Sequence, residues 1–417
     1  MKKSSIKKIK NKKILIAIIA LIVLLGACIS VVSHQDKNKY MINVTDMDLE
    51  SANQLLKDYE LNIDINYEYS DSIMENNIIS QSIEEKTIIN SGDKLNLLVS
   101  KGKLDLEKLK QDKINELGKV PIMMYHGIKN MKNSATNYIG GNVDKDGYTR
   151  TSEAFRNDLE TYYQKGYRMI KLSDYIKGEI DVEYGYSPII LTFDDGNDNN
   201  IKVTGLDSDG NIIIDPNSAV GILEEYKKKY PDYNVTAIFF LTNNLFNQKE
   251  YDEKIINWLI ENGYEVGNHT QGHNNFTQTD EKKTQEVVGY MYDKLGKITD
   301  KYSKIVALPF GSPYNKEHKN YKYIINGIYE DQEYQTEAAL RVGWEPEVSP
   351  FHKEFDKTFL KRCRAYDNNG KDFDIEMILR MLEKNRYISD GKVERIVTNN
   401  EFSDIINLDT DKEIIKY

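Results

Sequence analysis

The sequence predicts an α/β protein in which a large parallel sheet or barrel follows a small α+β module and an N-terminal hydrophobic segment. Three observations predict this architecture. Short apolar runs alternate with amphipathic segments from residue 120 to the end, which is typical of strands and helices that alternate in a mostly parallel sheet. One helical pattern and three β-rich runs fill residues 41–102. A lysine-rich start precedes an uncharged apolar run.

The first 33 residues are predicted to be an export signal or a membrane span. Seven lysines precede Ile14–Val32, an uncharged run of 19 residues that is just long enough to cross a bilayer. Leu25–Cys28 resembles the lipobox of bacterial lipoproteins, in which the cysteine (here Cys28) is acylated. Ile29 and Val31 continue the apolar run and favour an uncleaved span instead. Both alternatives anchor the chain in the cell membrane and place the later residues outside the cytoplasm.

The composition of the chain limits its partners and its stabilising bonds. A chain of 417 residues, 40% hydrophobic, can bury more than one core. Its net charge of −10 becomes −17 without the seven lysines of the first 28 residues, so the exported part is acidic and nucleic acid is not expected as a partner. Cys28 and Cys363 are the only cysteines, which excludes a disulfide framework.

Residues 41–102 are predicted to form a small independent module. Apolar residues from Leu49 to Leu56 fall at helical spacing, with Asp48 placed to cap the helix. Three runs rich in β-branched and aromatic residues follow, and they are Leu61–Tyr69, Ile78–Ser82 and Leu95–Ser100.

The same residues resemble a PASTA domain, a module found on penicillin-binding proteins and serine/threonine kinases. The resemblance lies in Asp48–Ala52 at the helix start, in Ile79–Ser82, and in Ser91–Leu95 before Val99–Gly102. It implies association with the cell wall, although many such modules act as spacers or protein contacts.

Residues 103–119 are predicted to be a helical linker, and residues 120–417 to be the large α/β domain. The apolar runs of this domain are Ile122–Tyr125, Met169–Leu172, Ile189–Phe193, Val235–Leu241, Tyr264–Val266, Ile305–Pro309 and Ala338–Val342. The amphipathic segments include Ser152–Gly166, Ala219–Tyr230 and Glu253–Gly263. Leu206–Ile214 is predicted to be a small surface hairpin. Active sites of such domains gather at the carboxyl ends of the strands.

Three groups of polar residues follow predicted strands. Asp194 and Asp195 end the run Leu-Thr-Phe-Asp-Asp-Gly. Two adjacent carboxylates are tolerable when a cation neutralises one and the other acts as a base, although Asp-Asp-Gly alone is usually a turn. His269 and His273 have the spacing of imidazoles on one helical turn, and with Asp195 they supply three metal ligands and leave positions open for water. His126 ends a third strand, either as a core histidine or as a proton donor.

Together these motifs resemble the NodB-type polysaccharide deacetylases, carbohydrate esterase family four, over residues 119–417. The resemblance implies a distorted (β/α) barrel, with Asp194 as general base and Asp195, His269 and His273 as ligands of a divalent metal. Zinc is the first choice of metal, with cobalt, nickel or manganese as alternatives. The Leu-Pro-Phe-Gly segment that contains Pro309 and Phe310 is similar to the third motif of the family, whose aromatic residue lends a backbone N–H to the developing oxyanion.

The sequence departs from the family pattern at two places. Ala307 stands where the family has an arginine that holds the catalytic aspartate, and Arg341, Arg362 and Arg364 are candidates to replace it. The C-terminal histidine that usually supplies the acid is absent. The Met-Tyr-His-Gly segment resembles the permuted version in biofilm poly-N-acetylglucosamine deacetylases, which gives the role of general acid to His126.

The predicted function is metal-dependent removal of acetyl groups from a cell-surface glycan, first of all peptidoglycan N-acetylglucosamine or N-acetylmuramic acid in a Gram-positive envelope. Two alternatives stay open: a deacetylase of exported poly-N-acetylglucosamine, and a catalytically degenerate protein that binds or organises the wall. Trp344 is either an apolar wall for the substrate or a core residue.

Overall fold

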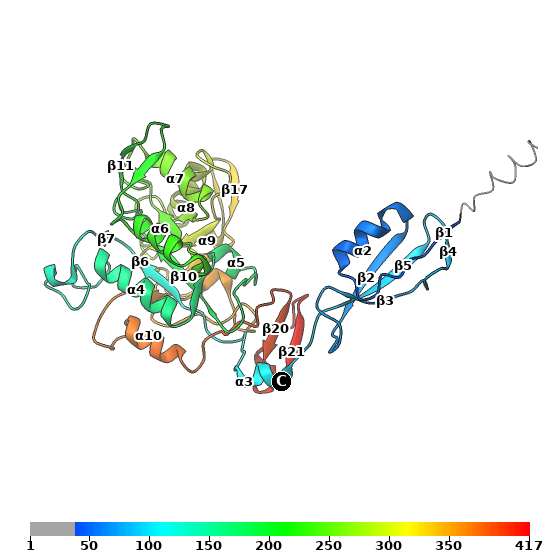
Figure 1. Ribbon diagram of the computed structural model, residues 1–417. Helices are drawn as coiled ribbons and strands as arrows, with labels where there is room; N and C mark the ends of the chain where they lie inside the picture. Colours follow the sequence, from blue (N-terminus) through cyan, green and yellow to red (C-terminus); the bar gives the residue numbers. More distant parts are fainter. Residues whose placement is uncertain (1–37) are drawn as a thin grey trace, which may run out of the picture. The chain divides into compact units, whose positions relative to one another are not determined.

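The computed structural model describes residues 38–417, which form two compact units that divide after Asp105 (Figure 1). The predicted membrane segment, residues 1–33 with Cys28, lies outside the described residues. Within residues 38–417, each helix is too short or too polar to span a bilayer.

The small unit consists of a three-stranded sheet with one helix. Strand β5 lies in the middle, parallel to β2 on one side and antiparallel to β3 on the other. The helix starts where the sequence predicts, because the Asp48 side chain accepts a hydrogen bond from the Ser51 backbone N–H. The elements are β1 (Lys39–Tyr40), α2 (Leu49–Leu56), η1 (Lys57–Tyr59), β2 (Asn62–Glu68), β3 (Ile78–Gln81), β4 (Ile88–Ile89) and β5 (Lys94–Ser100).

The large unit is built on an eight-stranded sheet that is parallel throughout, as the alternation of strands and helices predicts. Its strand order is β18-β15-β14-β13-β10-β6-β19, and β9 pairs with β10. The strands are β6 (Ile122–Tyr125), β9 (Tyr167–Met169), β10 (Ser187–Phe193), β13 (Ile238–Leu241), β14 (Glu265–Asn268), β15 (Ile305–Ala307), β18 (Ala338–Leu340) and β19 (Cys363–Arg364). The central strand β10 is buried along its whole length, as expected for a parallel sheet covered on both faces.

Helices surround this half-barrel sheet (Figure 1). They are α3 (Leu106–Gln111), α4 (Ser152–Gln164), α5 (Leu172–Tyr175), α6 (Ala219–Lys229), α7 (Asp252–Glu261), α8 (Glu281–Gly296), α9 (Tyr321–Ile325) and α10 (Ile375–Leu382), with the short 3-10 turns η2 (Asn133–Ala135), η3 (Pro231–Tyr233), η4 (Pro309–Gly311), η5 (Lys357–Phe359) and η6 (Asn400–Ile405). The helices α4, α6, α8 and α10 begin at side chains that cap a free backbone N–H: Thr151, Ser218, Asp280 and Asp374.

Stacked aromatic rings stabilise the pairing register at the ends of three neighbouring strands. Phe193 of β10 pairs with Tyr125 of β6 and with Phe239 of β13. Its ring stacks on both, with centroids 5.4 Å and 4.9 Å apart, and each such pair adds about 0.5–1.5 kcal/mol beyond area burial. The residues that follow Tyr125 and Phe193 therefore leave the sheet side by side.

Residues 360–364 hydrogen-bond to strands at the two opposite edges of the sheet. Leu360 exchanges backbone hydrogen bonds with Ala339 and Arg341 around the end of β18, and β19 pairs with β6. The two residues between these contacts are Lys361 and Arg362. The side chain of Arg362 is fully buried. It lies in the segment that connects the two edges of the sheet.

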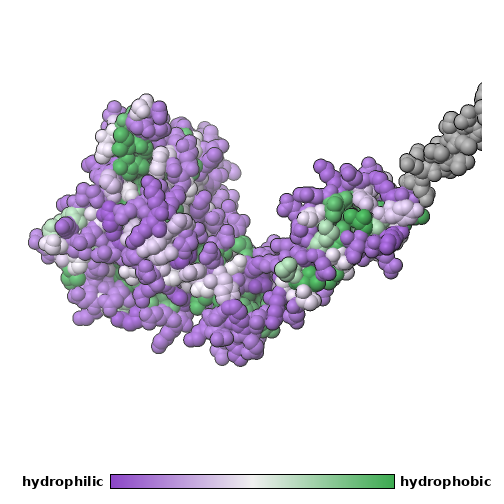
Figure 2. All heavy atoms as spheres, in the orientation of Figure 1, coloured by the Kyte–Doolittle hydropathy of each residue, from purple (hydrophilic) through white to green (hydrophobic). Residues whose placement is uncertain are grey.

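Smaller two-stranded sheets decorate the large unit. They are β7 (Ile128–Lys129) with β8 (Arg150–Thr151), β11 (Val203–Leu206) with β12 (Ile212–Ile214), β16 (Asn326–Tyr329) with β17 (Gln332–Gln335), and β20 (Arg395–Thr398) with β21 (Glu413–Lys416). The predicted surface hairpin is confirmed as β11–β12, and Figure 2 shows its hydrophobic side chains, of which Leu206 and Ile213 are exposed.

The predicted linker, residues 103–119, contains a short helix followed by residues that are buried in the large unit. Residues 106–111 form α3, whereas Ile114 and Glu116 are almost fully buried in the large unit. Asn115 and Lys119 form isolated bridges with Ile388 and Arg386 near the C-terminus. The second half of this segment is therefore part of the large unit.

Candidate metal centre and active site

The polar residues singled out in the sequence follow three strands of the half-barrel, at its carboxyl edge. His126 follows β6, Asp194 and Asp195 follow β10, and His269 follows β14. Backbone hydrogen bonds fix this arrangement, since Asp194 N donates to Tyr125 O and His269 N donates to Leu241 O at the end of β13. Parallel strands present their carboxyl ends at one edge, which is where active sites of such sheets form.

Asp195, His269 and His273 converge as the sequence predicts. Asp195 Oδ1 lies 3.3 Å from His269 Nε2 and 3.6 Å from His273 Nε2. One ligand atom from each of the three residues lies within 4.8 Å of the others. A carboxylate oxygen and two imidazole nitrogens form a common ligand set for zinc and similar divalent ions.

The hydrogen bonds of His269 fit a cation at this place. Its Nδ1 lies 2.8 Å from the carbonyl oxygen of Ala307, and a carbonyl only accepts, so Nδ1 carries the proton and the neutral ring presents the Nε2 lone pair. His269 Nε2 is buried and has no hydrogen-bond partner in the described structure. A buried lone pair that faces a carboxylate oxygen at 3.3 Å is satisfied by a positive charge between the two atoms.

Several residues around the cluster have left-handed backbone conformations that are costly for residues other than glycine. The φ angles are 76° at Asp195, 68° at Thr270, 53° at His273 and 58° at Phe310. Such conformations cost about 1–3 kcal/mol each and gather at functional sites. Here they turn the chain sharply after β10, β14 and β15, which brings short loops together over the strand ends.

Asp194 is held by an arginine that the sequence could not identify. Arg362 donates from Nη1 and Nη2 to the two carboxylate oxygens of Asp194, both at 2.7 Å, and neither side chain is more than 3% exposed. Burial alone would raise the pKa of Asp194, but the charge and hydrogen bonds of Arg362 outweigh it and hold the pKa well below its ordinary value. Arg341 and Arg364 point elsewhere, toward Phe359 and Tyr148.

His126 lies beside the acidic pair with its ring against Tyr148. The two ring centroids are 4.8 Å apart, and His126 Nδ1 is buried without a hydrogen-bond partner in the described residues. Burial lowers the pKa of His126, and the nearby carboxylates of Asp194 and Asp195 only partly offset this effect. The imidazole is therefore neutral near pH 7 and has to gain a proton before it can donate one.

The third motif brings Phe310, next to Pro309, to the same place. The Phe310 ring lies 4.5 Å from the ring of His273 and is 56% exposed. Trp344, on the loop after β18, is 52% exposed. The interpretation of Trp344 as a core residue is therefore wrong, and the ring is available to a ligand.

Two contributors were not assigned from the sequence. Arg362 was one of three candidates, and only the three-dimensional path of residues 360–364 distinguishes it. Tyr148 belongs to a loop with no periodic pattern, and its place beside His126 has no signal in the sequence.

The fold and the site define the large unit as an α/β enzyme domain with a candidate metal centre at the carboxyl edge of its sheet. Residues 182–323 match the polysaccharide deacetylase family, and residues 39–101 match the PASTA domain family. The chain thus carries a polysaccharide deacetylase domain after a PASTA domain, and it is a hydrolase that acts on carbon–nitrogen bonds other than peptide bonds.

Solved structures with weak similarity include enzymes and a kinase fragment. The Streptococcus pyogenes deacetylase PplD in complex with acetate is 17% identical, with a TM-score of 0.44 over 60% of this chain and 93% of that chain. BC0361, a polysaccharide deacetylase from Bacillus cereus, is 19% identical, with a TM-score of 0.44 over 63% and 69%. The three-PASTA-domain of a Ser/Thr kinase from Staphylococcus aureus is 18% identical, with a TM-score of 0.15 over 31% and 80%. No curated protein matches the chain significantly.

Proposed function

We propose that this protein is a metal-dependent N-deacetylase of a cell-surface glycan, with peptidoglycan N-acetylglucosamine or N-acetylmuramic acid as its substrate. The proposal rests on one observation, the arrangement of four side chains at the carboxyl edge of the sheet. Asp195, His269 and His273 converge on one point, while Asp194 next to them is fixed by Arg362. On this proposal the half-barrel sheet is the distorted (β/α) barrel of NodB-type deacetylases, which the segment around Arg362 completes.

The side chains have separate tasks in the proposed reaction. Asp195, His269 and His273 would hold the divalent cation, which when bound acidifies water and polarises the acetamide carbonyl. Asp194 takes the proton of the attacking water. Arg362 occupies only two of the roughly four acceptor positions of a carboxylate, so Asp194 can still accept that proton while its position stays fixed.

The remaining tasks fall to residues around the acidic pair. The backbone N–H of Phe310 stabilises the oxyanion that develops on the acetyl group. His126 gives a proton to the leaving amine after it has received one, and neutral imidazole is suited to that relay. Trp344 offers an exposed aromatic face to the sugar.

The rest of the chain supports the proposed substrate and location. The PASTA domain supports a place beside the wall, and the uncharged run Ile14–Val32 supports a single N-terminal anchor with the enzyme outside the cytoplasm. Exported poly-N-acetylglucosamine is the second candidate substrate, favoured by the position of His126 on the first strand of the sheet. The presence of Arg362 at Asp194 argues against a degenerate site.

The experiment that tests the proposal is acetate release from purified wall by residues 34–417. We expect release that a chelator stops and that added zinc, cobalt, nickel or manganese restores. Poly-N-acetylglucosamine serves as the parallel substrate, and faster release from it would transfer the proposal to that polymer. Wall binding without acetate from either polymer, with every metal, would leave only a wall-binding role.

A further inference from the structure

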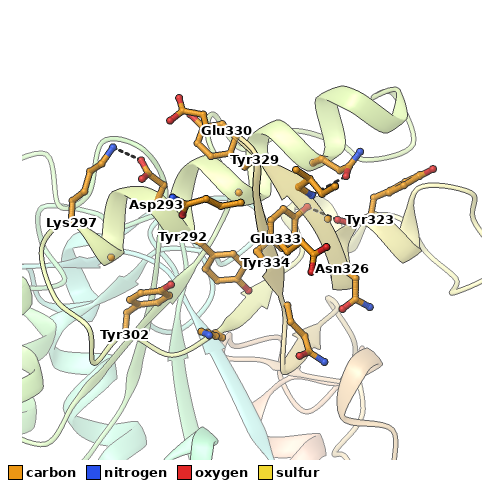
Figure 3. Close-up of a pocket in the computed structure, with 18 residues that line it drawn as sticks. Tyr292, Asp293, Lys297, Tyr302, Tyr323, Asn326, Tyr329, Glu330, Glu333 and Tyr334 are labelled. Atoms are coloured by element: carbon orange, nitrogen blue, oxygen red, sulfur yellow. Dashed lines mark hydrogen bonds and ion pairs between the residues drawn. The ribbon is translucent and has the colours of Figure 1, made fainter.

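A groove on the large unit lies outside the candidate active site. It runs between α8 and the β16–β17 hairpin and has a volume of about 980 Å³ (Figure 3). All of its lining residues lie between Gln285 and Gln335, and none is a residue of the candidate metal centre. Its size is at the upper end of the roughly 300–1,000 Å³ of small-molecule sites.

One glycine lets the hairpin pack closely on the helix, and another makes room for a tyrosine ring within the hairpin. A Cβ at Gly289 of α8 would stand 2.2 Å from the Cβ of Tyr329, and one at Gly327 of β16 would stand 2.5 Å from the ring of Tyr334. A larger residue at Gly289 would push the hairpin away from α8, and one at Gly327 would displace the ring of Tyr334, its cross-strand neighbour. The groove is therefore preformed by close packing and does not need a ligand to open it.

The groove offers aromatic ring faces in preference to free hydroxyl groups. Tyr334 donates its hydroxyl to the carbonyl of Tyr323, and the hydroxyl of Tyr292 is hydrogen-bonded to Thr336. The ring of Tyr292 lies 5.7 Å from that of Tyr334 and 5.9 Å from that of Tyr302. Figure 3 shows Tyr292, Tyr302 and Tyr334 on adjoining walls. Tyr292 is buried behind the surface, so a ligand meets the half-buried rings of Tyr302 and Tyr334.

The polar groups at the rim are mixed in charge and rich in amides. Asp293 is paired with Lys297 at 2.5 Å, which leaves the carboxylates of Glu330 and Glu333 and the ammonium of Lys304 among the charged lining groups. The amides of Asn326, Gln332 and Gln335 are exposed on the hairpin. Amides both donate and accept, and so do the hydroxyls of a sugar.

We propose that this groove is a second glycan-binding site, which holds a hexosamine segment of the polymer away from the metal centre. Pyranose rings have apolar faces that stack on aromatic rings, and their edges carry the hydroxyls and acetamides that the rim amides and Glu333 match. A lipid would need more aliphatic lining than Ile328 gives, and a nucleic acid would need an excess of positive charge. The choice of polymer rests on the proposed function; the geometry of the groove does not.

A second site changes how the enzyme meets a long substrate. A polymer bound in the groove raises the effective concentration of its other sugars near the catalytic edge, as in any bivalent contact. The gain exists only for chains long enough to span both sites. Short oligosaccharides should be hydrolysed without help from the groove.

The test is binding of a β-1,4-linked N-acetylglucosamine hexamer to the full chain, measured by calorimetry with chelator present to prevent hydrolysis. We expect Tyr302→Ala to weaken binding by about threefold to tenfold, the size of one lost ring contact, and Tyr302→Phe to restore it. Glu333→Gln, at an exposed position, should weaken binding without affecting the fold. Glu253→Gln, at an exposed position of α7 outside the groove, is the matched control.

Acetate release separates this inference from the proposed function. With metal present, the groove variants should raise KM for purified wall and leave the rate on an N-acetylglucosamine trimer unchanged. Wild-type affinity of Tyr302→Ala and Glu333→Gln for the hexamer would overturn the inference, whatever the activity. Loss of hexamer binding in these two variants would support it even if no glycan released acetate, which would overturn only the proposed function.

Discussion

The guanidinium of Arg362 and the carboxylate of Asp194 form a buried, bidentate ion pair although the two residues are 168 positions apart in the chain. The pair joins the end of β10 to residues 360–364, the segment that hydrogen-bonds to both edges of the sheet. Arg362 Nε also donates to the carbonyl of Arg341 after β18. One side chain thus ties three parts of the half-barrel to the candidate base.

Replacement of this arginine by lysine tests its role as a positioning residue. Arg362→Lys keeps a positive charge but loses the planar fork that fixes both oxygens of Asp194. We expect kcat for acetate release to fall by about 100-fold, the cost of a small misplacement at a reacting group, while the bound metal stays at the wild-type level by mass spectrometry. Arg380→Lys on the exposed side of α10 is the control. A variant with wild-type kcat would show that Asp194 needs no such support.

Loss of a metal ligand and loss of the base should have different signatures. His273→Ala removes one of three ligands, so both metal content and activity should disappear. Asp194→Asn keeps the three ligands and should retain metal while acetate release falls to background. Metal content is read by native mass spectrometry of each variant. Equal metal loss in both variants would mean that Asp194 belongs to the ligand set.

Much of this site could be predicted from the sequence because its parts are local. Each of His126, Asp194 and His269 follows a short apolar strand, and parallel strands bring their carboxyl ends to one edge. The spacing of His269 and His273 predicts one helical turn. The structure instead has a tight loop with φ of 68° at Thr270 and 53° at His273, so the predicted convergence was reached through a different backbone.

The identity of the arginine could not be predicted because it depends on closure of the sheet. Arg341, Arg362 and Arg364 lie within one stretch after β18, and all three have the charge that Asp194 needs. Only the path of the chain decides among them: β19 pairs with β6 over two residues, and the residue just before it points inward. A two-residue strand leaves no periodic pattern for sequence reasoning to detect.

The proposed acid can be tested by truncation. His126→Ala should lower kcat by roughly 10²–10⁴-fold, the usual contribution of a positioned proton donor, with metal content unchanged. Tyr148→Phe keeps the ring that packs on His126 and should have little effect, which makes it the matched control. Full activity of His126→Ala would assign the proton transfer to another group.

A second buried carboxylate, far from the reaction, should make stability depend on pH. Glu116 is 1% exposed and lies beside Asp390, which is paired with Arg395. Burial, and then the negative charge of Asp390, raises the pKa of Glu116 well above its ordinary value of 4.5. Between pH 4.5 and the pKa of the folded state, Glu116 therefore holds a proton in the folded protein that it has released in the unfolded protein. The Tyr387 hydroxyl donates a hydrogen bond to Glu116 Oε1 at 3.0 Å, and this contact only partly offsets the effect of burial.

Because the folded pKa is the higher one, this group's contribution to stability is complete below pH 4.5 and is lost as the pH rises through the folded value. Glu116→Gln cannot titrate, so the decrease in unfolding free energy from pH 5 to pH 8 should be smaller in this variant than in the wild type. Both tryptophans, Trp258 and Trp344, lie in the large unit, so urea unfolding followed by tryptophan fluorescence reports on this unit alone. Asp194 does not interfere, because its lowered pKa places its titration below that range. Parallel curves for the two proteins would mean that Glu116 is ionised in the folded state, with Tyr387 and the backbone N–H groups of Asp390 and Val397 as sufficient partners for its charge.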